Sequence, residues 1–227
     1  APARTALSAI GAAAEMQRDG YRARSGVSYP KSEVGTALKD VARMIKAKVG
    51  LQVAAVDYGE WDMHAGMGGA GSGWLREHLS QLARSLDAFA TDLGSTMDRV
   101  TVITLSEFGR RIKENGSGGT DHGHGNVMLV LSGHAVPGLH GSWPGLRDDQ
   151  LFEGADLAVT TDYRRVLSEI LIRRLGNPYL GSIFPGYVYP GPLGVVAGTD
   201  LPPDYSAPLF REGFEGGGIG RWSAHQG

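Results

Sequence analysis

Apolar residues recur at steps of three and four along residues 74–93, which is the spacing of an amphipathic helix. Gly94 follows directly, and glycine is the residue type that most often ends a helix. Similar spacing predicts a helix that begins after Pro30 and stops by Gly50. An alanine-rich stretch, residues 5–21, predicts a further helix that packs against something larger.

Another helix is predicted over residues 163–175. Asp162 precedes it and is a preferred N-cap residue, while Gly176 stands just past its end. Beyond this helix the chain becomes rich in Pro and Gly, with isolated aromatic residues. The composition therefore predicts one domain over residues 1–176 and an irregular tail, residues 177–227, that wraps around it.

Three short apolar runs predict buried strands at residues 51–56, 100–105 and 127–131. These runs alternate with the predicted helices, an order that is typical of parallel α/β architecture. Between the first strand and the next helix, residues 66–73 are rich in glycine and predict a flexible connection. The fold class predicted from the pattern is α/β with a mainly parallel sheet.

Composition and charge narrow the range of functions. The chain has 227 residues, of which 41% are hydrophobic, enough to bury a core. Its net charge of −2 and the lack of any Lys/Arg block argue against nucleic acid or an anionic membrane as a partner. No apolar run is long enough to span a bilayer. The start, Ala1-Pro2-Ala3-Arg4, lacks both Met and a signal pattern and indicates a processed, truncated or cloned fragment.

Side chains that bind metals gather in three loops beside the predicted strands. Asp62 and His64 are two residues apart, and on extended backbone both project to the same side. Since the chain has no cysteine, imidazole and carboxylate are the available ligands. They suit Zn²⁺, Mn²⁺ or iron, and leave Mg²⁺ or Ca²⁺ open for a carboxylate-rich part. The candidate metal ligands are Asp62, His64, Glu107, Asp121, His122 and His124.

Ordinary roles for the same residues stay open at this point. Glu107 and Arg110 can form a salt bridge at the end of a strand, and Asp121 can hold a turn. The glycine-rich residues 116–119 are not a phosphate-binding P-loop, because no Lys-Ser/Thr pair follows them. The remaining histidines are interpreted as ordinary polar residues: His78, His134, His140 and His225.

Several motifs in one order give the chain a family resemblance. They are Trp61-Asp62-Met63-His64, Thr104-Leu105-Ser106-Glu107-Phe108-Gly109-Arg110, Gly119-Thr120-Asp121-His122-Gly123 and Thr160-Thr161-Asp162-Tyr163-Arg164. With these motifs the chain resembles an exported bacterial family, the domain of unknown function 1501. That family is similar to a branch of the alkaline phosphatase and sulfatase superfamily. The resemblance covers most of residues 29–175.

The resemblance implies a fold and a metal centre. The fold would be an α/β/α sandwich with a mainly parallel sheet, alkaline phosphatase-like, holding one or two divalent ions, Zn, Mn, Mg or Ca. By position, Asp62 and His64 match the first ligand pair of the superfamily, and Glu107 matches the acid that ends the next strand. His122 or His124 matches a later ligand.

The resemblance also implies substrate contacts, a missing part and a location. Arg110 would bind an anionic oxygen of the substrate, a task that suits guanidinium. Met63 stands where the family usually has Thr, and Glu60 where it usually has Gly. The N-terminal part of the fold, with the Ser or Thr nucleophile, is missing from this chain, so that half of the same protein is an expected partner. Twin-arginine export of family members implies a periplasmic or secreted protein.

The leading hypothesis from sequence is a metal-dependent hydrolase of phosphate or sulfate esters, which acts on a small anionic ester. An alternative is a non-catalytic binding or assembly protein that retains the fold and a structural metal. A third is that the chain is one piece of a cleaved protein, held to its other half by a shared sheet.

Overall fold

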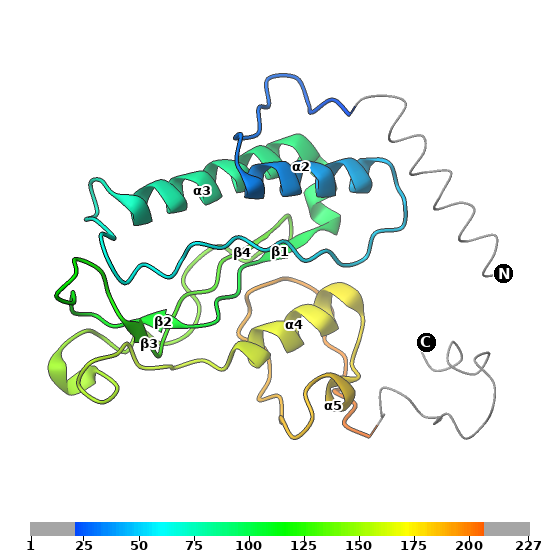
Figure 1. Cartoon of the computed structure of the whole chain (residues 1–227). Coiled ribbons are helices and arrows are strands. Elements are labelled where there is room, and N and C mark those ends of the chain that lie inside the picture. Colours follow the sequence, from blue (N-terminus) through cyan, green and yellow to red (C-terminus); the bar gives the residue numbers. More distant parts are fainter. Residues whose placement is uncertain (1–20, 207–227) are drawn as a thin grey trace, which may run out of the picture. The chain divides into compact units, whose positions relative to one another are not determined.

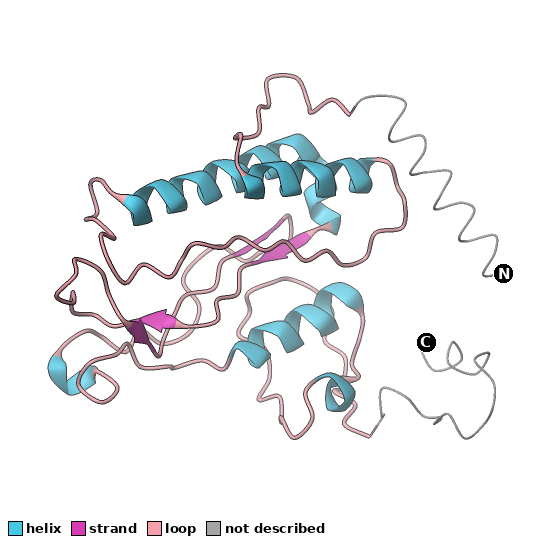
Figure 2. Cartoon of the chain, viewed as in Figure 1, coloured by secondary structure: helices cyan, strands magenta, loops and turns pink. Residues whose placement is uncertain are grey.

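The computed structural model describes residues 21–206 as helices, short strands and long irregular segments (Figure 1, Figure 2). The helix expected over residues 5–21 therefore lies outside the described residues, except for its last position. The chain divides into two compact units. The first unit comprises Ala1–Met97 and Arg110–His122, and the second comprises Asp98–Gly109 and Gly123–Gly227.

The first helix described, α2, spans Glu33–Lys46 in the first unit. It begins where the Ser32 side chain accepts a hydrogen bond from the backbone N–H of Gly35, at 3.2 Å. The helix predicted after Pro30 is thus confirmed, although it ends before the expected stop at Gly50. Its buried face is formed by Val34, Gly35, Leu38 and Ala42.

The longest helix of residues 21–206, α3, spans Trp74–Leu93 and has the predicted bounds. It lies alongside α2 (Figure 1). Only the C-terminal half of its apolar stripe is buried, with Phe89 and Leu93 in the core, whereas Leu79 is exposed. The periodic pattern therefore gave the bounds of this helix correctly but overestimated how much of one face is covered.

One carboxylate, Asp92, is buried on the inner face of α3. It accepts hydrogen bonds from the Tyr29 hydroxyl at 2.9 Å and from the backbone N–H of Arg24 at 2.6 Å, and it pairs with Tyr21 and Lys46. Burial alone would raise the pKa of Asp92, but these donors, with Lys46 foremost, hold the pKa below its ordinary value. The buried carboxylate thus links two segments to α3: the residues that precede α2 and, through Lys46, the last turn of α2.

In the second unit, β1 (Thr101–Ile103) pairs with β4 (Val130–Ser132). The two strands run antiparallel, with Val102 opposite Leu131. Both lie within or beside the second and third predicted strands and are shorter than expected. The strand positions were therefore predicted well, but the direction of pairing was not.

The described residues do not form the predicted parallel sheet. Parallel neighbours need a crossover, usually helical, and the described segment between β1 and β4 contains no helix. Two further strands, β2 (Gly109–Arg110) and β3 (His122–Gly123), form a separate two-stranded sheet. Residues 51–56, predicted as a strand, belong to neither sheet, and Val53 among them is 76% exposed.

Helix α4 spans Tyr163–Leu175, as predicted. The Asp162 carboxylate accepts a hydrogen bond from a backbone N–H of its first turn at 2.9 Å, and Gly176 ends the helix in a left-handed conformation with φ of 63°. Among the described residues, two short 3₁₀ helices, Gly94–Arg99 and Asp148–Gln150, also precede α4. A hydrophobic core forms between α4 and the segment after it. Its buried members are Val166 and Ile170 of α4 together with Val195 and Val196. The partly buried residues packed on them are Ile103, Met128, Val130 and Leu193.

The described part of the predicted tail, residues 177–206, contains one short helix, α5 (Leu180–Ile183), and is otherwise irregular. Val195 and Val196 bring it against α4, because both are buried in the core of the second unit. The rest of the predicted tail, residues 207–227, lies outside the described residues.

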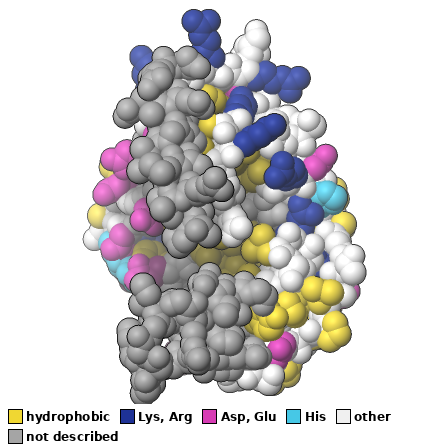
Figure 3. Space-filling view, turned by 90° about the vertical axis from the view of Figure 1, so that its right-hand side faces the viewer, with side chains coloured by type: hydrophobic (Ala, Val, Ile, Leu, Met, Phe, Trp, Pro, Cys, Tyr) yellow, Lys and Arg dark blue, Asp and Glu magenta, His cyan; other side chains and the backbone are white. Residues whose placement is uncertain are grey.

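Large hydrophobic side chains remain exposed in both units, among them Val53, Leu139 and Val188. Figure 3 shows hydrophobic side chains, in yellow, on one face of the molecule. Exposed apolar side chains that stand alone are normal in proteins, whereas Val53, Ala54 and Ala55 are three consecutive exposed apolar residues and need an explanation. Within residues 21–206, no helix combines the length and the apolar character that crossing a membrane requires.

Candidate metal centre

Two loops of the first unit meet along their backbones. One follows residues 51–56 and contains Asp62 and His64, and the other, residues 115–121, leads into β3. Backbone hydrogen bonds hold the two loops together over several residues. They run from the N–H of Gly66 to Ser117 (3.1 Å), from Met67 to Gly118 (2.8 Å) and from Thr120 to Met63 (3.3 Å).

The contact between the loops depends on Gly119. A Cβ atom at this position would lie 2.4 Å from the carbonyl carbon of His64 and 2.5 Å from the carbonyl oxygen of Met63. Backbone atoms cannot move aside as a flexible side chain can, so only glycine allows this approach. The glycine in the second loop thus brings His122 near a histidine that lies far away in the sequence.

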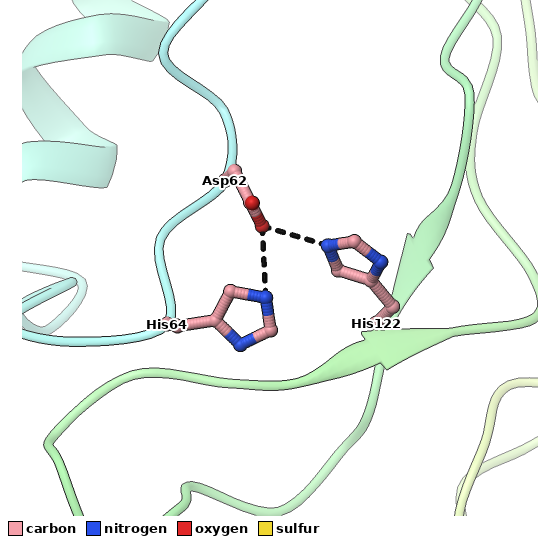
Figure 4. A group of neighbouring side chains, drawn as sticks. All are labelled: Asp62, His64 and His122. Atoms are coloured by element: carbon pink, nitrogen blue, oxygen red, sulfur yellow. Dashed lines mark hydrogen bonds and ion pairs between the residues drawn. The ribbon is translucent and has the colours of Figure 1, made fainter.

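Asp62, His64 and His122 form a cluster where the two loops meet (Figure 4). One Asp62 oxygen, Oδ1, lies 3.0 Å from Nε2 of His64 and 2.7 Å from Nε2 of His122. One ligating atom from each residue lies within 4.8 Å of the other two. Within residues 21–206, these three side chains are the group of acidic, histidine and cysteine residues close enough to share a metal ion.

The cluster is open to solvent. The side chains of Asp62, His64 and His122 are 59%, 47% and 48% exposed. A structural zinc site closes around its ion with four protein ligands, whereas a catalytic site uses three and leaves one position free. Three exposed ligands therefore match the open kind of site better than the closed kind.

The two distances from Asp62 to the imidazoles are close to the ligand spacing around a small divalent ion. Two nitrogen or oxygen atoms that each lie about 2.1 Å from a tetrahedral ion are roughly 3.4 Å apart. The distances from Asp62 to the two imidazoles, 3.0 Å and 2.7 Å, are slightly shorter than this. Because the Asp62 side chain is exposed, it can shift by a few tenths of an ångström without disturbing a packed core.

The surroundings favour the ionised form of Asp62. The hydrogen bond from His122 is the main cause that holds the pKa of Asp62 below its ordinary value, and the nearby His64 and Arg110 act in the same direction. The carboxylate is therefore available as a ligand at neutral pH.

Arg110, at the end of β2, links the two loops. Its guanidinium donates to the backbone carbonyl oxygens of Trp61 and Thr120, and to Oδ1 of Asp62 at 3.2 Å. By these contacts Arg110 fixes the Asp62 carboxylate relative to the backbone of both loops. The expectation that Arg110 binds an anionic oxygen of a substrate stays a prediction.

Asp121 lies beside the cluster. Its Oδ1 is 3.1 Å from Nδ1 of His64, on the edge of the ring away from Asp62, and it accepts a hydrogen bond from the Asn115 amide at 3.0 Å. That amide is the main cause of a lowered pKa of Asp121, with His64 second. Sequence reasoning missed Asn115, although an Asn ahead of a Gly-Ser-Gly-Gly run is a typical turn former and offers a signal.

Two expected ligands, Glu107 and His124, belong to the second unit. The ring of His124 stacks on Phe152, with centroids 4.2 Å apart. The participation of Glu107 and His124 in a metal centre stays a prediction. Among the histidines interpreted as ordinary, His78 stacks on Tyr58, with centroids 4.8 Å apart, and its Nε2 lies 3.0 Å from a backbone oxygen.

Comparison with known proteins identifies a family. Residues 4–176, which make up most of the chain, match the family described as Protein of unknown function (DUF1501). No curated protein and no solved structure matches the chain.

Proposed function

Since the chain belongs to the DUF1501 family, we propose that it is the metal-binding part of a hydrolase that cleaves phosphate or sulfate esters. The observation that carries this proposal is the convergence of Asp62, His64 and His122 within 4.8 Å of one another. The three residues come from a loop and from the start of β3, two segments that lie far apart in the sequence, and their exposure leaves room for a substrate.

The proposed roles follow from the atoms present. His64 and His122 offer their Nε2 atoms, and Asp62 offers a carboxylate oxygen. Two imidazoles favour Zn²⁺ or Mn²⁺ over Mg²⁺ and Ca²⁺, which prefer oxygen ligands. A divalent ion at such a site polarises an ester oxygen and lowers the pKa of bound water. Arg110 keeps Asp62 aimed at the imidazoles, and its charge attracts an anionic ester.

We further propose that the chain is a branch of the alkaline phosphatase and sulfatase superfamily, exported from the cytoplasm. Its motifs, in their order, support this kinship. Residues 51–56, which precede the proposed metal-binding loop and include the exposed apolar Val53, Ala54 and Ala55, are suited to pair with strands of an N-terminal half. That half would complete an α/β/α sandwich and supply the nucleophile, while Glu107 and His124 would add ligands to the centre.

Metal titration of the chain tests the centre. Calorimetry with Zn²⁺, Mn²⁺, Mg²⁺ and Ca²⁺ is expected to give stoichiometric binding, strongest for Zn²⁺ or Mn²⁺. His64→Ala and His122→Ala are expected to abolish it. His134→Ala is the matched control, because His134 is exposed and lies outside the cluster. Absence of stoichiometric binding to the unaltered chain, or equal binding by all variants, would refute the metal centre.

Ester hydrolysis tests the reaction. The chain joined to its N-terminal half is expected to cleave an aryl phosphate or an aryl sulfate, and to lose this activity in His122→Ala. If the joined protein binds the metal but cleaves neither ester, the hydrolase proposal fails. The alternative, a non-catalytic binding protein with a structural metal, would then be the better description.

A further inference from the structure

The side chain of Asn115 connects the two loops of the metal centre. Its Nδ2 donates to the carbonyl oxygen of His64 at 2.9 Å and to Oδ1 of Asp121 at 3.0 Å. Its Oδ1 accepts from the backbone N–H groups of Ser117 at 2.9 Å and Gly119 at 3.2 Å. Both donors and the acceptor of one amide are thus used, which is the arrangement of a group that fixes a structure.

The hydrogen bonds of Asn115 lead to a particular atom of His64. Asn115 holds Asp121, and Oδ1 of Asp121 faces Nδ1 of His64 at 3.1 Å. An ionised carboxylate can only accept, so Nδ1 must carry the proton of this bond. In the neutral ring the lone pair is then on Nε2. That atom lies 3.0 Å from Oδ1 of Asp62, so without a cation the Asp62 carboxylate competes with Asp121 for the proton of the ring. A cation between Nε2 and Asp62 satisfies both lone pairs.

We propose that Asn115 and Asp121 are positioning residues, which fix the Nδ1–H tautomer of His64 and turn its Nε2 toward the metal ion. In this arrangement Asp121 contacts His64, which is the metal ligand, and does not contact the ion itself. From sequence, Asp121 was instead counted among six metal ligands. A carboxylate that accepts from the second nitrogen of a ligating histidine orients the ring and raises its basicity. The inference rests on the proposed metal centre.

The local packing supports this assignment. Gly119 lies so close to the backbone of His64 that a Cβ atom there would come within 2.4 Å of the carbonyl carbon of His64. The backbone of Asn115 also closes the turn of the second loop, because its N–H donates to the carbonyl oxygen of Gly119 at 2.8 Å. Asp121 therefore reaches His64 from a loop whose geometry Asn115 sets.

Nitrogen NMR of the metal-free chain tests the tautomer without any metal. Because the Asp62 carboxylate faces Nε2, the measurement is made in an Asp62→Ala background, in which Asp121 still faces Nδ1. At a pH where His64 is neutral, its Nδ1 is expected to be protonated and its Nε2 unprotonated in this background. Asp121→Asn is expected to convert His64 partly to the other tautomer, because an amide can donate to Nδ1. Asn115→Ala is expected to give a mixture of both tautomers. Protonation of Nε2 in the Asp62→Ala chain, with Asn115 and Asp121 intact, would overturn the proposal.

Zn²⁺ titration separates a positioning residue from a ligand. Loss of an outer hydrogen-bond partner lowers metal affinity by about 10–100-fold. We expect that loss in Asp121→Asn and Asn115→Ala with the stoichiometry unchanged, and partial recovery in Asp121→Glu. Loss of binding in Asp121→Asn as complete as in His122→Ala would show that Asp121 is a ligand and would refute the inference.

Two further variants guard against a trivial loss of structure. Asn115→Asp keeps the acceptor for Ser117 and Gly119 but removes both donors, so a weaker affinity despite the added negative charge supports the proposal. Asn126→Ala is the matched control, since Asn126 also bridges backbone groups, those of Phe108 and Val127, away from the cluster. It is expected to leave tautomer and affinity unchanged. If the unaltered chain binds no metal, the proposed function fails while the NMR result still decides the positioning role.

Discussion

Replacing Glu169 by Ala should destabilise the second unit more than any other single carboxylate change within it. Glu169 lies on α4, and its side chain is 0% exposed. It accepts hydrogen bonds from the backbone N–H groups of Leu193 at 2.7 Å, Gly194 at 2.9 Å and Val196 at 3.0 Å. Arg173 adds a fourth bond at 3.1 Å. One buried carboxylate thus anchors the tail on the helix.

The magnitude follows from the donors that lose their partner. Leaving a buried donor unsatisfied costs about 1–3 kcal/mol. Three backbone donors would lose the carboxylate, while Arg173 keeps Asp200 at 2.7 Å and the carbonyl oxygen of Val196 at 2.9 Å. Water entering the vacated space offsets part of the loss, so we expect about 3–5 kcal/mol, the range for breaking a buried pair. For a chain of this size that corresponds to a fall in Tm of roughly 6–20 °C.

Thermal and denaturant unfolding of the full chain measure the total effect, and amide hydrogen exchange locates it. Exchange should speed up at Leu193, Gly194 and Val196, the residues whose N–H groups the carboxylate holds. Glu169→Gln keeps one oxygen acceptor and should lose less stability than Glu169→Ala.

Asp149→Ala is the matched control. Asp149 also pairs with an arginine, Arg147 at 3.1 Å, but its side chain is 71% exposed. An exposed pair of this kind contributes about 0–1 kcal/mol. If Glu169→Ala lowers stability no more than Asp149→Ala, or leaves exchange of the three amides unchanged, the reasoning about the buried carboxylate is wrong.

Three other changes test the first unit. Because the pKa of Asp92 is lowered on folding, its contribution to stability is present above about pH 4, the ordinary Asp value, and is lost as the pH falls through the folded pKa. Asp92→Asn should therefore lower stability at neutral pH and flatten the acid part of a stability curve measured by fluorescence. Gly119→Ala should weaken Zn²⁺ binding in calorimetry, whereas Gly116→Ala, where an added Cβ meets nothing within 4 Å, should not. Arg110→Lys keeps the charge but cannot bridge two carbonyl oxygens and Asp62. The free energy of opening of the two loops, measured by amide hydrogen exchange, should therefore fall by about 2 kcal/mol. Equal exchange rates in the variant and the unaltered chain would contradict this.

The helices were predictable because their signals are local. The apolar steps of residues 74–93, followed by Gly94, define α3 to the residue. Asp162 and Gly176 likewise mark the ends of α4. The sequence also pointed to the members of the possible metal-binding triad, since the absence of cysteine left His and carboxylates, and Asp62 with His64 stood out by their spacing.

Pairing and convergence were decided only by the tertiary structure. A short apolar run does not reveal which neighbour a strand will find, so β1 and β4 pair antiparallel and residues 51–56 pair with no described strand. Which candidate ligands meet depends on contacts between distant loops, such as Gly119 against His64. From sequence alone, Asp121 was equivalent to His122 as a ligand. The fold places the carboxylate behind the ring of His64, because Asn115 holds it there.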